Sequence, residues 1–334
     1  MRILVLGGTG FIGPYVVEEL ITLGHELALF NRGNKLLNHN IQTIKGDKND
    51  LVSYRDEFIA FNPDVVLHMN AYTKQDAEIA METFGDISDR IVVVSSMDVY
   101  SAYGILLSLE NNEIKATPLS EESSLRSKLY PFGGEYEKIL VEDIVMNRYA
   151  KISGTILRLP MVYGPGDNSH RLFKYAKRIQ DERLHIVFDE LFAGWKASRG
   201  YVENIAHAIV LATTKDKARD EVYNVSETSH FTELEWVSKI AEVMNWNVAI
   251  IPIPRDNLPE KLIYSSLNLA QDWTIESNKI RIELGYRELV SSRQAIERTI
   301  EWETSNAPNN LQLEDYPGFY YESEDEVLSK LGMM

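Results

Sequence analysis

Blocks of apolar and polar residues alternate along the first half of the chain. Residues 2–6 form a short apolar run typical of a buried parallel strand, and residues 15–23 carry apolar side chains at helical spacing. This succession of strand and helix continues to residue 167 and predicts an α/β fold, a Rossmann doubly wound parallel sheet. Further strands are expected at residues 26–30, 41–47, 63–68, 90–96 and 154–159, with helices beginning near residue 51 and spanning about 135–150.

The second half of the chain has a looser pattern. Residues 101–129 are polar and lack clear periodicity, which predicts a long loop. Pro252, Pro254 and Pro259 predict an interruption of regular structure. An acidic tail at residues 315–334 packs either on the body of the protein or on a partner. Helices are expected at residues 171–180, 202–213, 233–244 and 292–303, the third capped by Thr232, and strands at residues 185–188 and 222–225.

Three glycines follow the first strand directly and precede the first helix. Gly7 permits a tight turn, Gly10 lets a pyrophosphate approach the backbone, and Gly13 lets the helix lie close to the sheet. The free amides and dipole at the helix N-terminus favour an anion. The context of strand and helix favours a dinucleotide site over a purely structural turn. The intervening residues expected at this site are Thr9, Phe11 and Ile12.

The end of the second predicted strand bears on which dinucleotide is bound. Dinucleotide folds often place an acid there to bind the adenosine ribose, but this chain has Asn31 followed by Arg32. Arg32, helped by Lys35, can instead pair with a ribose 2′-phosphate. The pattern favours NADP over NAD and leaves both open, with a solvated turn as the alternative.

Polar residues also follow the third and fourth predicted strands. Asp47 either accepts a hydrogen bond from the adenine amino group or caps the next helix. Asn70 and Ala71 leave the fourth strand beside the expected cofactor. His68 is interpreted as a packed residue at the strand end, because no other acid or histidine is spaced with it as a metal site.

Composition narrows the class of protein. The 334 residues are 44% hydrophobic and 25% charged, which is ordinary for a globular protein. The net charge of -16 argues against binding to nucleic acid or to an anionic membrane. The absence of cysteine excludes disulfides and thiolate chemistry. No apolar run is long enough to span a bilayer, and the first strand leaves no room for a signal peptide, so a cytoplasmic protein is expected.

Several motifs occur in one order along about residues 1–303. Together they resemble the extended short-chain dehydrogenase/reductase family, the nucleoside-diphosphate-sugar epimerases and dehydratases. The motifs are Gly7-x-x-Gly10-x-x-Gly13, Asp47 after the third strand, Ser95-Ser96-x-x-Val99-Tyr100, Lys138-x-x-x-Glu142, the run from Leu157 to Asp167, Arg199-Gly200-Tyr201-Val202 and Val222-Tyr223-Asn224-Val225.

The resemblance implies an NAD(P)-dependent oxidoreductase, epimerase or dehydratase acting on a nucleotide-sugar, with hydride exchange at nicotinamide C4. It implies that Ser96 binds the reacting oxygen. It implies that Lys138 lowers the pKa of a catalytic phenol and holds the nicotinamide ribose. Pro160 and Val162 would adjoin the nicotinamide carboxamide.

The resemblance also suggests how the chain divides and binds its substrate. Arg199 and Arg171 are candidates for binding the substrate diphosphate, with surface ion pairs as the alternative. A homodimer through the helices at about residues 74–86 and 135–149 is the default for the family. The expected division is an NAD(P)-binding domain at residues 1–165, to which 199–226 return, and a smaller C-terminal α/β substrate domain at residues 166–198 and 227–314.

The chain departs from the family pattern at the catalytic phenol. The resemblance places a tyrosine at position 134, where this chain has Gly134. On a regular helix Tyr136 would point about 200° away from Lys138, so it is not expected to replace that phenol. Tyr130 either supplies the phenol from a loop or is a packing aromatic. Asp98 either carries protons, if buried, or caps a loop.

The missing tyrosine leaves a second function open. A non-catalytic NAD(P)-binding sensor or scaffold would resemble the atypical relatives that lost this residue, which include plastid proteins associated with RNA. The net charge of -16 disfavours RNA binding here. Fold resemblance alone does not separate the two functions, because function resides in the site.

Overall fold

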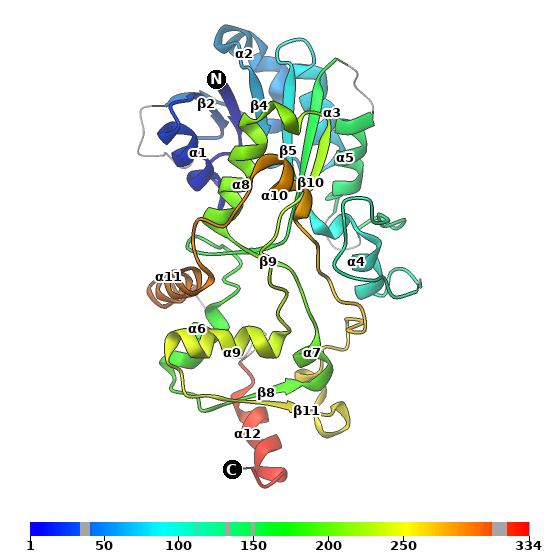
Figure 1. The fold of residues 1–334 in the computed structure, drawn as a ribbon, viewed down its shortest axis with the longest axis vertical. Coiled ribbons are helices and arrows are strands. Elements are labelled where there is room, and N and C mark those ends of the chain that lie inside the picture. The colour runs from blue at the N-terminus through cyan, green and yellow to red at the C-terminus, as the bar shows by residue number, and fades with distance from the viewer. Residues whose placement is uncertain (34–40, 112, 131–133, 148–150, 309–318, 334) are drawn as a thin grey trace.

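The upper part of the molecule in Figure 1 is built on one parallel sheet. The computed structural model describes residues 1–333 apart from 34–40, 112, 131–133, 148–150 and 309–318. The sheet has seven strands in the order β10-β6-β5-β4-β1-β2-β3, which confirms the predicted Rossmann architecture. The strands are β1 (Arg2–Leu6), β2 (Glu26–Asn31), β3 (Gln42–Lys45), β4 (Val65–His68), β5 (Arg90–Ser96), β6 (Ser153–Leu159) and β10 (Glu221–Asn224).

Helices cover both faces of the sheet, because successive side chains of a strand point to opposite faces. Ile3 and Val5 of β1 pack in one core with α1 (Gly13–Thr22) and α8 (Val202–Thr214). Leu4 and Leu6 pack in a second core on the opposite face. This second core contains side chains of α2 (Arg55–Phe61), α3 (Lys74–Phe84) and α5 (Lys138–Asn147). None of the helices among the described residues is long and apolar enough to cross a bilayer.

The strand register brings the chain segments of the predicted cofactor site to one edge of the sheet. Leu6 lies opposite Phe30 of β2 and opposite His68 of β4. His68 in turn lies opposite Val93 of β5. The loops that leave these strands therefore meet at the carboxyl edge, where doubly wound sheets bind their ligands.

The lower part of Figure 1 is built around a small second sheet of two parallel strands, β8 (His185–Asp189) and β11 (Ala249–Ile253). Thr232 caps α9 (Glu233–Met244) as predicted, since its hydroxyl accepts from the Glu235 amide at 3.1 Å. The domain boundaries themselves stay a prediction. The other elements are β7 (Met161–Tyr163), β9 (Arg199–Tyr201), α6 (Phe173–Gln180), α7 (Glu190–Gly194), α10 (Asn278–Leu284), α11 (Ser292–Ser305) and 3₁₀ helices at Lys48–Tyr54, Met97–Val99, Asp216–Ala218, Arg255–Asn257 and Glu260–Leu262.

Two expectations about irregular structure are wrong in part, since the described residues 107–129 form no helix or strand and Pro254 and Pro259 lie outside β11. The predicted loop at residues 101–129 begins with a helix, α4 (Ser101–Leu106), in which only Tyr103 is not fully buried. A helix buried on nearly all sides has no polar face, so it leaves no amphipathic pattern in the sequence. Pro252 lies inside β11, where it is tolerated because β11 pairs with β8 alone and is an edge strand.

The described part of the acidic tail forms a further helix, α12 (Tyr321–Lys330), that packs on the same chain. Glu324 and Arg178 of α6 form a buried ion pair. Arg183 pairs with Asp325 at 2.6 Å, and the Tyr321 hydroxyl donates to Asp181 at 3.0 Å. The tail therefore packs on the body of the protein through this helix, while residues 315–318 lie outside the described part.

Glu324→Gln is expected to lower the free energy of unfolding by about 2 kcal/mol, because it removes one charge of the buried ion pair between Glu324 and Arg178. Thermal or denaturant unfolding measures the loss. Glu322→Gln on the exposed side of the same helix is the matched control and should change little. Equal stability of the two variants would contradict a docked tail helix.

Candidate functional site

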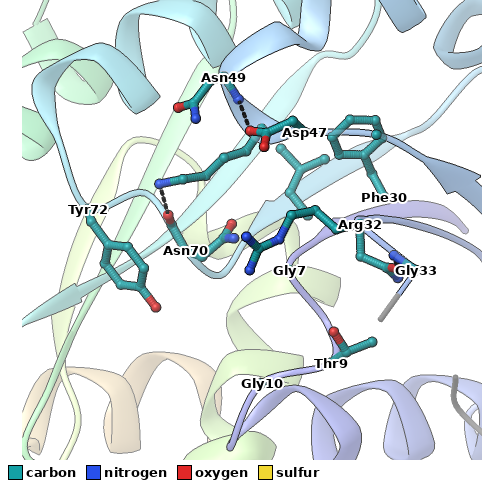
Figure 2. A pocket seen from close by; sticks show the side chains of 14 residues that line it. Gly7, Thr9, Gly10, Phe30, Arg32, Gly33, Asp47, Asn49, Asn70 and Tyr72 are labelled. Atoms are coloured by element: carbon teal, nitrogen blue, oxygen red, sulfur yellow. Dashed lines mark hydrogen bonds between the residues drawn. The ribbon is translucent and has the colours of Figure 1, made fainter. Parts of the chain in front are cut away.

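A cavity of about 450 Å³ opens at the carboxyl ends of β1, β2 and β4. It brings together seven residues predicted to bind the cofactor: Gly7, Thr9, Gly10, Asn31, Arg32, Asp47 and Asn70. Figure 2 shows most of them around one opening. The remaining lining residues are Leu6, Phe30, Gly33, Gly46, Lys48, Asn49 and Tyr72, none of which was singled out from the sequence as a cofactor residue.

The three glycines of the first turn meet different surroundings. Gly7 has a φ of +82°, and a Cβ there would lie 2.6 Å from the Asn70 side chain. A Cβ on Gly13 would lie 2.4 Å from the backbone of Gly8. A Cβ on Gly10 would meet nothing within 4 Å. Gly7 and Gly13 are therefore required by the fold, whereas Gly10 faces the open space that a ligand would fill.

The end of the cavity beside β2 carries a cation. Arg32 is exposed, and its guanidinium points into the opening in Figure 2. The Asn31 side chain accepts from the Gly33 amide at 2.7 Å, so it shapes the turn. Lys35, the expected helper of Arg32, lies outside the described residues.

Asp47 and Lys48 follow β3 on the other side of this opening. Asp47 caps the following 3₁₀ helix by accepting from the Asn49 amide at 2.9 Å, the capping role foreseen as one of two (Figure 2). The Lys48 amine donates to the Asn70 carbonyl at 3.2 Å and to Asp76 at 2.6 Å. Burial raises the pKa of Asp76, but hydrogen bonds from Lys48 and from backbone amides outweigh it and hold that pKa below its usual value.

Lys138 lies buried at the carboxyl ends of β4 and β5. Its amine donates to the Ala71 carbonyl at 2.6 Å and to the Val94 carbonyl at 2.8 Å. The Tyr72 ring lies 4.9 Å from the same nitrogen and 5.0 Å from that of Lys48. Burial lowers the pKa of Lys138 to about 8, although nearby carboxylates oppose this shift. A lysine with this pKa carries a charge that responds to mildly alkaline pH.

Ser96 and Asp98 lie beside this lysine, at the end of β5. The Ser96 hydroxyl accepts from the Asp98 amide at 3.3 Å. The Asp98 side chain is buried, and one of its oxygens accepts from the Tyr136 hydroxyl at 2.7 Å. Burial raises the pKa of Asp98, against opposing effects of the Tyr136 hydrogen bond and the Arg126 charge. Asp98 therefore meets the burial condition under which the sequence suggested a proton carrier.

The expectation that Tyr136 points away from Lys138 is wrong, because α5 begins at Lys138 and not near residue 135. Tyr136 is extended and forms an isolated bridge with Thr73. The adjacent Glu137 amide donates to the Tyr72 carbonyl at 2.9 Å, which holds this segment against the end of β4. The Tyr136 ring centre lies 6.0 Å from the Lys138 amine.

Tyr130 lies in a row of aromatic rings beside this group. Its ring stacks on Tyr103 at 6.1 Å and meets Tyr136 edge-on at 5.1 Å. Tyr103 stacks in turn on Trp273 at 4.5 Å. This packing fits the interpretation of Tyr130 as a packing aromatic, and its catalytic role stays a prediction.

A second cavity of about 200 Å³ contains both arginines predicted to bind the substrate. Arg199 is buried, pairs with Glu233 and lies 4.8 Å from the Trp236 ring. Arg171 is more exposed and pairs with Asp167 at 2.9 Å. Both therefore form ion pairs in the structure while facing a possible ligand. The lining residues are Met161, Tyr163, Arg171, Leu172, Lys174, Tyr175, Phe192, Trp195, Arg199, Glu233 and Trp236.

The other predicted cofactor residues do not line the first cavity. Val162 of β7 is buried next to Met161, which lines the second cavity. Their predicted contacts with a cofactor stay predictions. These residues are Phe11, Ile12, Gly13, Ala71, Lys138, Pro160 and Val162.

The fold and the first cavity define a Rossmann-type nucleotide-binding protein. Residues 3–226 match the model of the NAD dependent epimerase/dehydratase family. The chain therefore belongs to this family, and the resemblance inferred from the ordered motifs is confirmed.

Individual relatives are distant. The chloroplast stem-loop binding protein of 41 kDa b from Arabidopsis thaliana is 24% identical over 253 residues, which cover 69% of this chain and only 60% of that protein. A UDP-glucose 4-epimerase from Thermotoga maritima, solved with UDP-glucose, is 20% identical and superposes with a TM-score of 0.68 over 92% of this chain and 100% of that one. A dTDP-glucose 4,6-dehydratase from Bacillus anthracis, solved with NAD, is 17% identical with a TM-score of 0.68 over 92% of this chain and 97% of that one.

Proposed function

We propose that the protein is an NAD(P)-dependent oxidoreductase, epimerase or dehydratase of a nucleotide-sugar, with hydride exchange at nicotinamide C4 beside Ser96 and Lys138. One observation carries the proposal. The cavity at the glycine turn reaches Tyr72, whose ring lies 4.9 Å from the Lys138 amine. The pyrophosphate position and the buried lysine therefore lie along one edge of the sheet, as a dinucleotide requires.

The residues present fit this cofactor. Gly10 leaves open space beside the N-terminus of α1, where a pyrophosphate finds free amides. Arg32 and Asp47 lie on either side of the adenosine position, and Lys138 is placed to hold the nicotinamide ribose. The bound nicotinamide supplies the hydride chemistry, and the protein supplies orientation and proton handling.

The choice between the two cofactors rests on Arg32. It is an exposed cation that points into the cavity, and the residue before it is an asparagine without charge. A ribose 2′-phosphate would pair with this guanidinium. We infer a preference for NADP over NAD, which the tighter binding of NADP would support.

The second cavity is the proposed substrate site. It combines five aromatic rings with the cations Arg171, Lys174 and Arg199, a combination that suits a nucleotide base and a diphosphate. Arg199 is already neutralised by Glu233, so Arg171 and Lys174 are the better candidates for the diphosphate. Proteins of the same fold were solved with UDP-glucose and with UDP-glucuronic acid, which supports this substrate class.

The test combines binding and turnover on the full-length protein. Calorimetry with NADP and NAD should give saturable binding, with NADP tighter. Incubation with either cofactor and with UDP-glucose, UDP-glucuronic acid or dTDP-glucose should give an epimerised, dehydrated or oxidised sugar, detected by mass and NMR. Failure of both cofactors to bind at millimolar concentration would sink the proposal.

A second candidate function is a non-catalytic NAD(P)-binding sensor or scaffold. Gly134, at the position of the family's tyrosine, is exposed, and a Cβ there would meet nothing within 4 Å. The similarity to a chloroplast stem-loop binding protein points in the same direction, although the net charge of -16 opposes RNA binding. Tight cofactor binding without turnover of any sugar would favour this function.

The assembly of the protein is a separate question, and a homodimer through α3 and α5 stays a prediction.

A further inference from the structure

We propose that Tyr136 and Asp98 form the proton-transfer pair of this site, in place of the phenol that is absent at position 134. The inference rests on the proposed function and identifies two catalytic residues for it. The Tyr136 hydroxyl donates a hydrogen bond of 2.7 Å to the Asp98 carboxylate, beside Ser96 and Lys138.

Tyr136 occupies the position that a proton donor to the substrate would need. Its hydroxyl interacts with Ser96, the residue expected to bind the reacting oxygen. Its ring centre lies 6.0 Å from the Lys138 amine, within the field of that cation. The Tyr136 side chain is only partly buried, so a ligand can reach it.

Asp98 is held rigidly on the other side of the phenol. The Arg126 guanidinium donates to the Asp98 carbonyl at 2.5 Å and to Glu137 at 2.9 Å. These contacts tie the end of β5 to the chain segment that carries Tyr136. The second oxygen of the Asp98 carboxylate is buried and makes no hydrogen bond within the described residues. A buried acceptor without a hydrogen bond lowers stability, and a catalytic role is one explanation for keeping it.

The charges in this pair suit a relay. Burial and the Asp98 charge raise the pKa of the Tyr136 phenol, so this phenol stays protonated at neutral pH and is not by itself available to accept a proton. Burial also raises the pKa of Asp98, which makes its carboxylate a stronger base than an exposed one. The phenol can therefore accept a proton only as it passes its own to Asp98. The two residues then act as one unit.

The step balances as follows for oxidation of a sugar alcohol. The substrate O–H bond breaks and its proton goes to the Tyr136 oxygen, while the Tyr136 proton goes to the Asp98 carboxylate. A bound oxidised nicotinamide would accept the substrate hydrogen and its electron pair as hydride when the C–H bond breaks and the C=O bond forms. Asp98 ends neutral, and reduction follows the reverse course.

Several other groups face Asp98 and set its titration. They are the cations Arg126 and Lys138, the Ser96 hydroxyl and the phenols Tyr103 and Tyr136. Of these, the Tyr136 hydrogen bond lowers the pKa of Asp98 most. Removing the hydroxyl should therefore raise the pKa of Asp98, and this effect can be measured without a cofactor.

The test uses Tyr136→Phe and Asp98→Asn in the full chain. Each is expected to lower kcat by about 100-fold or more while leaving cofactor affinity unchanged. Asp98→Asn should also remove the acidic limb of the kcat profile, because the wild-type rate rises with pH as Asp98 ionises. Tyr286→Phe, which removes a buried phenol elsewhere, is the matched control and should retain wild-type turnover.

A second measurement is independent of turnover. Carbon-13 NMR titration of labelled aspartate in the cofactor-free protein should show a higher Asp98 pKa in Tyr136→Phe than in the wild type. Turnover of Tyr136→Phe within twofold of wild type, or an unchanged Asp98 pKa, would overturn the pair. A wild-type protein that converts no sugar contradicts the proposed function and the catalytic role together, whereas active wild type with active Tyr136→Phe contradicts the pair alone.

Discussion

Lys138→Ala is expected to lower turnover by at least about 1000-fold. The substitution removes the buried ammonium that lies between the Ala71 and Val94 carbonyls, beside the Tyr136 ring. A developing negative charge on the phenol or the substrate oxygen would lose its nearest cation. Steady-state kinetics with the best sugar from the substrate panel measures the effect.

The control must separate chemistry from folding, because the variant also removes the hydrogen bonds that Lys138 donates to the Ala71 and Val94 carbonyls. Lys74→Ala removes a half-exposed lysine at the start of α3 and should keep wild-type turnover. Circular dichroism and cofactor calorimetry show whether Lys138→Ala is folded. A folded Lys138→Ala with undiminished turnover would remove Lys138 from the site.

The same lysine predicts a pH dependence. Burial lowers its pKa to about 8, compared with an ordinary value of 10.5 in the unfolded chain. Turnover that needs the ammonium should fall as pH rises through 8. Between pH 8 and 10.5 the unfolded state binds more protons than the folded state, so this lysine should make the protein more stable as pH rises, by about 3 kcal/mol in total. The difference in unfolding free energy between wild type and Lys138→Ala isolates this contribution.

Gly13→Ala is expected to lower the stability of the protein, whereas Gly10→Ala is expected to lower its affinity for the cofactor. The Cβ of Gly13→Ala would lie 2.4 Å from the Gly8 backbone, so strand and helix must move apart. A loss of more than about 3 kcal/mol in unfolding free energy is expected. The Cβ of Gly10→Ala enters open space, so stability should stay within about 0.5 kcal/mol of wild type.

The two variants should also differ in ligand binding. Gly10→Ala places a methyl group where the pyrophosphate would approach the backbone, so cofactor affinity should fall by at least about 100-fold in a stable protein. Calorimetry and denaturant unfolding on both variants measure the contrast. If Gly10→Ala binds NADP as wild type does, the cofactor does not lie against this turn.

The sheet was predictable because its signals are local. The central strands β1, β4 and β5 are short apolar runs buried on both faces, and the register of Leu6 with Phe30 and His68 follows from parallel pairing. The glycine turn was predictable for the same reason, since its backbone geometry depends on three nearby residues. It was predictable that Arg32 and Asp47 line one cavity, because each follows the end of a strand in the same parallel sheet.

The rest depended on contacts that sequence spacing does not encode. Lys48 lines the cavity, and its amine is held there by a hydrogen bond to Asp76, which is distant in the sequence. The only feature of the sequence that points to Lys48 is its position directly after the predicted third strand. The pairing of Arg199 with Glu233 depends on how β9 meets α9, and no periodicity reports it. Tyr136 was misplaced because the start of α5 was set too early, and helix ends are poorly marked in this segment.

Because α5 begins only at Lys138, the number of residues between two motif positions does not by itself give the distance between them in this chain. Four residues of helix advance about 6 Å along the axis, and two residues of extended chain advance about 6.6 Å. An aromatic residue two positions before Lys138 in extended chain therefore lies as far ahead of it as one four positions before it in a helix. Searches that count residues to find a phenol partner for a lysine would pass over this chain, whereas a search by Cartesian separation would retain it.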